Sequence, residues 1–375
     1  MNEQERQLMA KIFAGYYAEA ELDIPSIEHR EFGIGNYKKI DARHLSFANV
    51  SDFRRYLTTN TPFFVSHSTS YYDFPAATPI QKKQWTGADV VFDLDIHATG
   101  KYAAYAKLDM VKADLLRLVD DFLIGDFGVD EKDLIINFSG NRGYHVHIRD
   151  PRFLPLGGDE RRELVDYIMG HGLDYSKFFS DSYTTDSKKA RLIGPRPVEG
   201  GYRGRFTRGV IRLLETEPKS ISRLFSDPMK REFFISGIKE GNWSKTSLKF
   251  DDLVSRLKIV ADGLAVQSVD TDAGVTQDLS KLIRVPNTIH GETGLIAKML
   301  KGRGSIERFE PLRDALIETK AIADETMMIL FTEDVPALVL GGETLGPFKK
   351  DERKESRLPL SIFYVLKGSA SVVIR

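Results

Sequence analysis

Two aspartates, Asp93 and Asp95, stand one residue apart inside an apolar run that extends from Val90 to Ile96. Successive side chains of a β-strand point to opposite faces, so in a strand the two carboxylates share one face. Without a cation between them they would repel each other and carry a desolvation cost. The pair therefore predicts a divalent metal site suited to phosphoryl transfer. An exposed edge strand with two solvated acids is the structural alternative, but the apolar neighbours on both sides favour a central strand.

The segment Ser139–His145 has the composition of a phosphate-binding turn. Glycines let backbone N–H groups turn towards an anion, while hydroxyl, guanidinium and imidazole groups supply further donors. The donors in this segment are Ser139, Gly140, Arg142, Gly143 and His145. Taken alone the segment is an ordinary β-hairpin turn, but the aspartate pair upstream favours a triphosphate cradle. His147 shares the face of His145, and we interpret it as a packing or hydrogen-bonding residue.

A third polar block, residues 270–294, mixes acidic side chains with Arg284 and His290 around a Pro-Asn turn. It can bring one more carboxylate and two more phosphate-facing donors to the same site. Spacing alone cannot rank its three aspartates, which are Asp270, Asp272 and Asp278.

The elements that must position these residues can be inferred from hydrophobic periodicity. The pattern predicts helices over 3–17, 108–122 and 305–323, a strand over 89–96, and a strand-turn-strand hairpin over 134–148. Strands and helices alternate at both ends of the chain, whereas helical patterns dominate the middle, which indicates an α/β (α+β) domain with a helical insertion. The expected boundaries are 1–206 and 263–375 for the discontinuous α/β catalytic domain and 207–262 for the helical subdomain.

Composition narrows the chemistry further. The chain has 375 residues, a formal net charge of −1 and no cysteine. The near-neutral charge argues against a protein that coats nucleic acid by bulk electrostatics. Without cysteine a thiolate zinc site is excluded, and carboxylate ligands suit Mg²⁺ or Mn²⁺. No run of eighteen apolar residues and no signal peptide is found, so we expect no membrane association and a cytoplasmic location.

The three blocks, in this order, resemble the small catalytic subunit of the archaeal and eukaryotic DNA primases, the archaeo-eukaryotic primase superfamily. The motifs that carry the resemblance are the hydrophobic-Asp-x-Asp strand at 91–95, Ser139-Gly-x-Arg-Gly-x-His145 and Leu282-Ile-Arg-x-Pro-x-x-x-His290. The resemblance extends from about residue 28 to about residue 300. The chain departs from the family in one respect, because it lacks the cysteine-rich zinc knuckle that members commonly carry after the aspartate strand.

The resemblance implies a mixed-sheet primase catalytic domain that makes short primers from nucleoside triphosphates on a single-stranded DNA template. It implies a two-metal site with Mg²⁺ or Mn²⁺ held by Asp93, Asp95 and a third aspartate, and the family's spacing selects Asp272 over Asp278. It assigns the nucleotide's phosphates to Ser139, Arg142, His145, Arg284 and His290, with Arg43 as a further candidate. The implied partner is a large primase subunit in a heterodimer.

Three other functions stay open on the sequence. One is a primase-polymerase that fills gaps or joins ends in DNA repair, and another is a non-catalytic nucleic-acid-binding subunit that retains the hairpin. The third is a two-metal nuclease, which would degrade DNA without any nucleoside triphosphate.

Overall fold

The computed structural model describes residues 1–182, 191–265, 269, 271–319, 322 and 324–373. The chain divides into two compact units. The first unit contains Met1–Leu116, Asp130–Arg162 and Thr271–Arg375, and the second contains Arg117–Val129 and Glu163–Asp270. Helices and several antiparallel sheets build the chain, which confirms the predicted mixed α/β fold. The segment 207–262, predicted as a helical subdomain, lies within the second unit.

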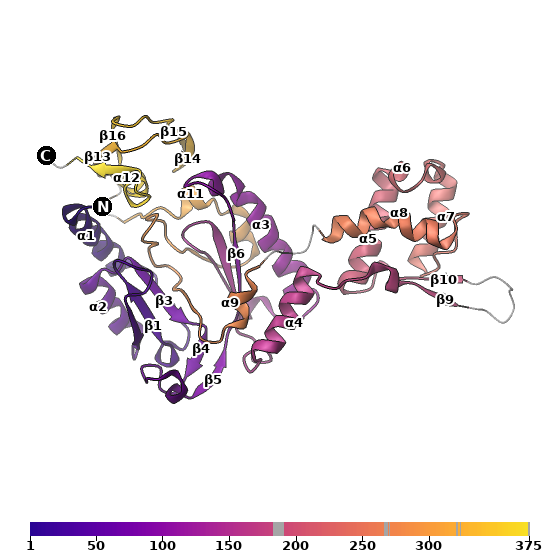
Figure 1. Ribbon diagram of the computed structural model, residues 1–375, viewed down its shortest axis with the longest axis horizontal. Helices are drawn as coiled ribbons and strands as arrows, with labels where there is room; N and C mark the ends of the chain where they lie inside the picture. The colour runs from indigo at the N-terminus through magenta and orange to yellow at the C-terminus, as the bar shows by residue number, and fades with distance from the viewer. Residues whose placement is uncertain (183–190, 266–268, 270, 320–321, 323, 374–375) are drawn as a thin grey trace. The chain divides into compact units, whose positions relative to one another are not determined.

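A four-stranded antiparallel sheet of the first unit carries Asp93 and Asp95. Its strands follow the order β12 (Met299–Leu300), β7 (Leu134–Phe138), β8 (Gly143–Ile148) and β6 (Val90–Asp95). β7 and β8 are the two arms of the predicted hairpin, and β6 pairs with β8. β6 is therefore an edge strand, and the prediction of a central strand is wrong. Its apolar character has another cause, because helix α9 (Ala273–Gln277) lies beside it (Figure 1).

A second four-stranded antiparallel sheet stands in the same unit. Its strands follow the order β11 (Leu282–Arg284), β3 (Phe64–Ser68), β1 (Phe32–Gly35) and β2 (Ala42–Leu45). Helices α1 (Glu3–Glu19) and α2 (Val50–Asn60) belong to the same N-terminal part of the chain and contact each other. The predicted helix over 3–17 is confirmed by α1, which begins with a capping box formed by Asn2 and Glu5.

The remaining elements of the first unit are short. A β-ribbon of β4 (Ser70–Tyr72) and β5 (Trp85–Ala88) leads into β6. Near the C-terminus, α12 (Leu358–Leu366) packs on the sheet of β16 (Arg353–Arg357), β13 (Thr326–Phe331) and β17 (Ala370–Val372). A separate ribbon joins β14 (Leu338–Leu340) and β15 (Glu343–Leu345).

Two helix predictions differ in detail from the structure. The helix over 108–122 is present as α3 (Leu108–Arg117), and the chain continues as a π-helical segment over Leu118–Ile124. The single helix over 305–323 is wrong, because the chain forms α10 (Arg303–Arg308) and then a separate short α11 (Pro311–Asp314). Pro311 starts the second piece because its ring has no N–H to continue a helix. Residues 320, 321 and 323 of that prediction lie outside the described residues.

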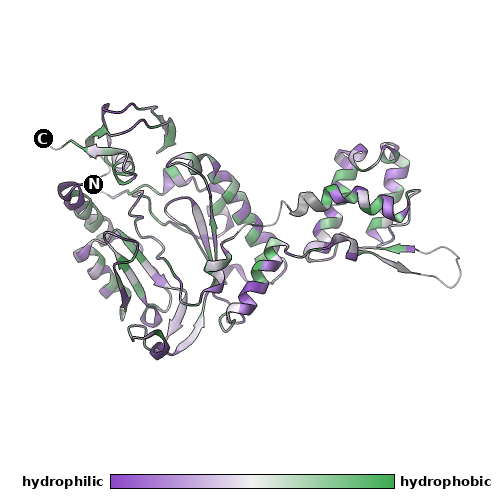
Figure 2. Ribbon diagram, in the orientation of Figure 1, coloured by the Kyte–Doolittle hydropathy of each residue, from purple (hydrophilic) through white to green (hydrophobic). Residues whose placement is uncertain are grey.

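The second unit is mainly helical. It contains most of α4 (Gly158–Met169) and the helices α5 (Gly201–Thr216), α6 (Pro218–Ile221), α7 (Pro228–Lys239) and α8 (Phe250–Ala265), accompanied by the ribbon of β9 (Ser180–Ser182) and β10 (Arg191–Ile193). Figure 2 shows hydrophobic and hydrophilic residues alternating along these helices, as expected when one face of each is buried. Trp243 and Phe206 lie in the core of this unit, and both are buried.

None of the helices in the described part of the chain is long and apolar enough to span a membrane.

Candidate active site

The two aspartates lie on one face of β6, as the alternation predicts. Phe92 and Leu94 are buried on the opposite face. On the carboxylate face, Val91 packs against Val275 and Ile283, so the apolar cover ends just before the acidic residues. Asp93 is half-buried and Asp95 is exposed.

Residues 271–276 cover the free edge of β6 and bring Asp272 to it. The amide of Asp272 donates to the carbonyl of Asp93 at 3.0 Å, and Thr271 Oγ1 donates to the same carbonyl at 3.2 Å. Thr276 Oγ1 donates to the carbonyl of Val91 at 2.7 Å. Asp272 Oδ1 caps α9 by accepting from the amide of Gly274 at 2.9 Å.

The other two aspartates of the third block are Asp278 and Asp270, of which the structure describes only Asp278. Asp278 lines the same cleft as Asp93, but its Oδ1 accepts from the amide and the hydroxyl of Ser280 at 2.8 and 2.7 Å. Asp270 lies outside the described residues.

The carboxylates perturb one another. Burial, and then repulsion by Asp95 and Asp272, raise the pKa of Asp93 to about 7, against the attraction of Lys281 and Lys39. Burial and the two nearby carboxylates both disfavour ionisation of Asp93, and a cation would stabilise its charged form. By charge and donor type this set fits a hard divalent cation. Within the described residues, however, no three acidic or histidine side chains converge on a ready-made metal position. A shared ion therefore requires the exposed Asp272 side chain to turn towards the pair.

The predicted phosphate-binding turn joins β7 to β8. Ser139 Oγ accepts from the amides of Asn141 and Gly143 at 3.3 and 3.2 Å, so the hydroxyl stabilises the turn itself. Gly140 has a positive φ of 82°, and a Cβ on it would lie 2.8 Å from His290 Cβ. Thr293 Oγ1 donates to the carbonyl of Gly140 at 2.6 Å. The turn is thus docked against the segment that carries His290.

Two histidines of the site are neutral donors. Burial, with repulsion by His147 and Arg284, lowers the pKa of His145 to about 3, and burial with repulsion by Arg284 holds the pKa of His290 well below its usual range. Asn137 Nδ2 lies 3.4 Å from His145 Nδ1, and the amide of Glu292 donates to His290 Nδ1 at 3.2 Å. Since each Nδ1 accepts, each Nε2 carries the proton. His145 Nε2 lies 3.7 Å from Asp93 Oδ1.

The two arginines of the predicted phosphate-binding set differ in their hydrogen bonds. Arg142 Nη2 donates to Asp95 Oδ2 at 3.0 Å. Arg284 Nη1 is buried and has no hydrogen-bond partner in the part of the chain that the structure describes. Burial lowers the pKa of Arg284 to about 10, which still leaves it charged at neutral pH. A buried cationic donor without a partner is costly, and an anionic ligand would satisfy it.

A single cleft of about 450 Å³ gathers most of the predicted residues. The predicted residues that line it are Asp93, Asp95, Ser139, Arg142, His145, Arg284 and His290, and Arg43 also lines it. Asp272 is the one predicted site residue that does not line this cleft; it adjoins the cleft through its backbone contact with Asp93. The cleft also contains two cations that sequence reasoning missed, Lys39 and Lys281.

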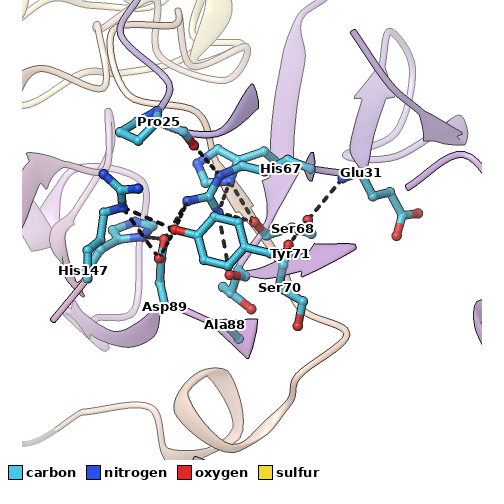
Figure 3. A network of polar contacts seen from close by, with 12 residues as sticks. Pro25, Glu31, His67, Ser68, Ser70, Tyr71, Ala88, Asp89 and His147 are labelled. Carbon is cyan, nitrogen blue, oxygen red and sulfur yellow. Dashed lines mark hydrogen bonds and ion pairs between the residues drawn. The ribbon is translucent and has the colours of Figure 1, made fainter. Parts of the chain in front are cut away.

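A buried polar network at the start of β6 was also missed (Figure 3). Asp89 is fully buried, and its Oδ2 lies 2.8 Å from Arg30 Nη2 and 3.3 Å from His147 Nδ1. Figure 3 shows Tyr71, Asp89 and His147 pointing towards one another, and the Tyr71 hydroxyl bonds the same carboxylate. Attraction to Arg30 and the His147 hydrogen bond hold the pKa of Asp89 below its usual range, although burial alone would raise it. The interpretation of His147 as a hydrogen-bonding residue is confirmed.

A second buried arginine, Arg161, binds the backbone at the same point. Arg161 donates from Nη1 to the carbonyl of Asp89 at 2.6 Å and from Nη2 to the carbonyl of Ala88 at 2.9 Å. The residue directly before β6 is therefore held by its side chain and by its backbone. A charged residue at position 89, in phase with Asp93 and next to apolar residues, was the signal in the sequence that could have revealed this anchor.

Comparison with known proteins gives a consistent result. The family model for the DNA primase small subunit matches residues 92–301. The DNA primase small subunit PriS of Methanocella arvoryzae is 34% identical over 406 aligned residues, which cover 99% of both chains. The proteins of the same name from Archaeoglobus fulgidus (32% identical, 97% of both chains) and Thermoplasma acidophilum (31% identical, 96% of this chain and 99% of the other) are also similar.

Proposed function

The chain belongs to the family of DNA primase small subunits, and on that premise we propose that it is the catalytic subunit that makes primers for DNA replication. The reaction is template-directed nucleotidyl transfer. The observation that carries the proposal is the single cleft in which two carboxylates face the cationic and imidazole donors of the hairpin turn and of β11. Carboxylates on one side and phosphate donors on the other are what an in-line transfer between a hydroxyl and a triphosphate requires.

Asp93, Asp95 and Asp272 are the residues that would hold Mg²⁺ or Mn²⁺. Bound there, the ions would lower the pKa of a 3′-hydroxyl and neutralise the departing pyrophosphate. The mutual repulsion at Asp93 supports the assignment, because it is relieved when positive charge enters the site. The absence of cysteine from the chain leaves carboxylate and imidazole groups as its metal ligands.

The donors of the cleft would bind the triphosphate. Arg284 offers an unused buried N–H to a phosphate oxygen, and the neutral His145 and His290 each offer an Nε2 proton. Arg142 can exchange Asp95 for a phosphate, to which a guanidinium binds in bidentate fashion. Ser139 supports this set by holding the turn that carries Arg142.

We further propose that nucleoside triphosphates and a single-stranded DNA template are the substrates, and that the subunit works in the cytoplasm in a heterodimer with a large primase subunit. The name of the relatives, small subunit, supports a larger partner. The exposure of Asp95 at the end of β6 supports access for a polynucleotide.

The direct test is synthesis without a primer. The purified chain, with and without its large subunit, is given single-stranded template, ribo- or deoxynucleotides and Mg²⁺ or Mn²⁺, and product formation is measured. We expect oligonucleotide products, and a loss of more than about 100-fold in Asp95→Asn. Asp109→Asn is the matched control, since its side chain is 88% exposed on α3, and it should retain full activity.

Three outcomes would overturn the proposal. Extension of a supplied primer without synthesis from single nucleotides would indicate a repair polymerase. Full activity of Asp95→Asn would remove the carboxylates from the reaction. Degradation of labelled DNA in the absence of nucleotides would indicate a nuclease.

A further inference from the structure

Two lysines in the cleft have no role in the proposed triphosphate site. Lys39 lies in the loop between β1 and β2 and is exposed, whereas Lys281 directly precedes β11 and is half-buried. Both line the cleft of Asp93. Neither ammonium group forms an ion pair with any residue that the structure describes. They come from the sheet of β11, β3, β1 and β2, whereas the carboxylates and the hairpin turn come from the sheet of β6 and β8.

Hydrogen bonds stabilise the loop that carries Lys39. Asp41 Oδ2 accepts from the amides of Asn36 and Tyr37 at 2.7 and 2.8 Å, and the amide of Asp41 donates to the carbonyl of Ile34 at 2.8 Å. The turn is tight enough that a Cβ on Gly35 would overlap the carbonyl oxygen of Lys38. A lysine on such a loop is presented to the cleft at a reduced cost in backbone entropy when it binds a ligand.

Hydrogen bonds also stabilise the loop that carries Lys281 and join it to β2, which follows the Lys39 loop. Besides the hydrogen bonds of Ser280 to Asp278, the amide of Lys281 donates to the carbonyl of Asp278 at 3.1 Å. Arg43 of β2 donates from Nη2 to the carbonyl of Ser280 at 2.9 Å and from Nε to the buried Glu31 at 2.8 Å. Arg43 therefore links the two segments whose backbones carry Lys39 and Lys281.

Both lysines line the cleft that also contains Asp93 and His290. The arginines of the predicted triphosphate site are half-buried and its histidines are buried, and both types of side chain offer N–H donors in fixed directions. Lysine is instead a hydrated point charge on a flexible stem, which suits sequence-independent contact with a phosphate backbone. The exposure of Lys39 suits a polymer that continues beyond the cleft.

We propose that Lys39 and Lys281 form a binding site for the phosphodiester backbone of single-stranded DNA at the open edge of the cleft, opposite Asp93. The proposal rests on the proposed function, since it takes the polynucleotide as a substrate of the same site. Arg43 is then a positioning residue that keeps the two lysine loops together.

The test is the salt dependence of DNA binding, measured without nucleotide and without divalent metal. Binding of a fluorescent single-stranded oligonucleotide to the full-length chain is followed by anisotropy over a series of NaCl concentrations. The logarithm of the affinity falls with the logarithm of salt with a slope of about −0.7 for each phosphate contacted on a single strand. Lys39→Gln/Lys281→Gln should therefore reduce the magnitude of the slope by about 1.4. Lys11→Gln/Lys350→Gln, which removes two exposed lysines outside the cleft, should leave the slope unchanged.

An unchanged slope in Lys39→Gln/Lys281→Gln would overturn the inference. If the same variant also raised the KM for the nucleoside triphosphate, the lysines would be assigned to the triphosphate instead. Failure of the proposed function is distinguishable, because it would remove primer synthesis from the unmodified chain while the slope difference persisted. Asp95→Asn provides the converse check, since it should lose synthesis and keep the wild-type slope.

Discussion

Replacing Arg30 by methionine should loosen the strand that carries Asp93. Arg30 and Asp89 are each 1% exposed in their side chains, and Nη2 lies 2.8 Å from Oδ2. The substitution also removes hydrogen bonds of 2.7 Å to the hydroxyl of Tyr71 and to the carbonyl of Ser68. Asp89 would remain buried without its main counter-charge. Removing one partner of a buried ion pair costs about 3–5 kcal/mol.

Hydrogen exchange of the β6 and β8 amides measures this cost locally, which matters because the chain has two compact units. If the pair contributes as proposed, Arg30→Met should accelerate exchange of the most protected of these amides by about 100- to 3,000-fold, since 1.4 kcal/mol corresponds to a factor of ten. Amides of the second unit should not change. Arg55→Met is the matched control, because Arg55 pairs with Asp52 on the surface of α2 and is 75% exposed. An acceleration in Arg30→Met of less than about tenfold would refute the reasoning.

Three further predictions concern the same unit. The pKa of Asp89 is lowered in the folded protein, so the stability that its ionised form contributes is fully present above the unfolded value near pH 4 and is lost as the pH falls below it. In the acid range, the free energy of unfolding of Asp89→Asn should therefore fall less steeply with decreasing pH than that of the wild type, by up to about 1.4 kcal/mol per pH unit. Arg142→Gln should raise the KM for nucleoside triphosphates about tenfold or more in a primer-extension assay, whereas unchanged KM would exclude a phosphate contact. Gly143→Ala should separate β8 from β6, because the added Cβ would overlap the carbonyl of Leu94, and native-like protection of both strands would contradict this.

Local sequence pattern was enough to predict the elements that carry most of the proposed site residues. The alternation of Val90–Asp95 gave the buried and open faces of β6, and glycines between two apolar runs gave the hairpin of β7 and β8. The cleft also contains most of the residues chosen from their types and spacing. These features depend on contacts between near neighbours in the sequence, which is where periodicity is informative.

Periodicity does not predict contacts between segments that are distant in the sequence. The apolar pattern of β6 predicts a central strand, because the sequence of the strand does not show that α9, about 180 residues later in the chain, covers it. Asp89 shares the face of Asp93, yet only its pairing with Arg30, 59 residues away, distinguishes this structural carboxylate from the proposed metal ligands. Lys39 and Lys281 were missed for the same reason. Each lies in an ordinary polar loop, and only the fold shows that both line the same cleft as Asp93 and Asp95.

Asp93, Asp95 and Asp272 are proposed to share divalent cations, and Mn²⁺ binding tests this most directly. Bound Mn²⁺ is counted by electron paramagnetic resonance, with a nucleoside triphosphate present, for the wild-type chain, Asp272→Asn and Asp278→Asn. We expect Asp272→Asn to weaken binding by about tenfold or more, while Asp278→Asn, whose carboxylate is engaged by Ser280, binds like wild type. Wild-type affinity in Asp272→Asn, or a loss confined to Asp278→Asn, would contradict the proposed metal site.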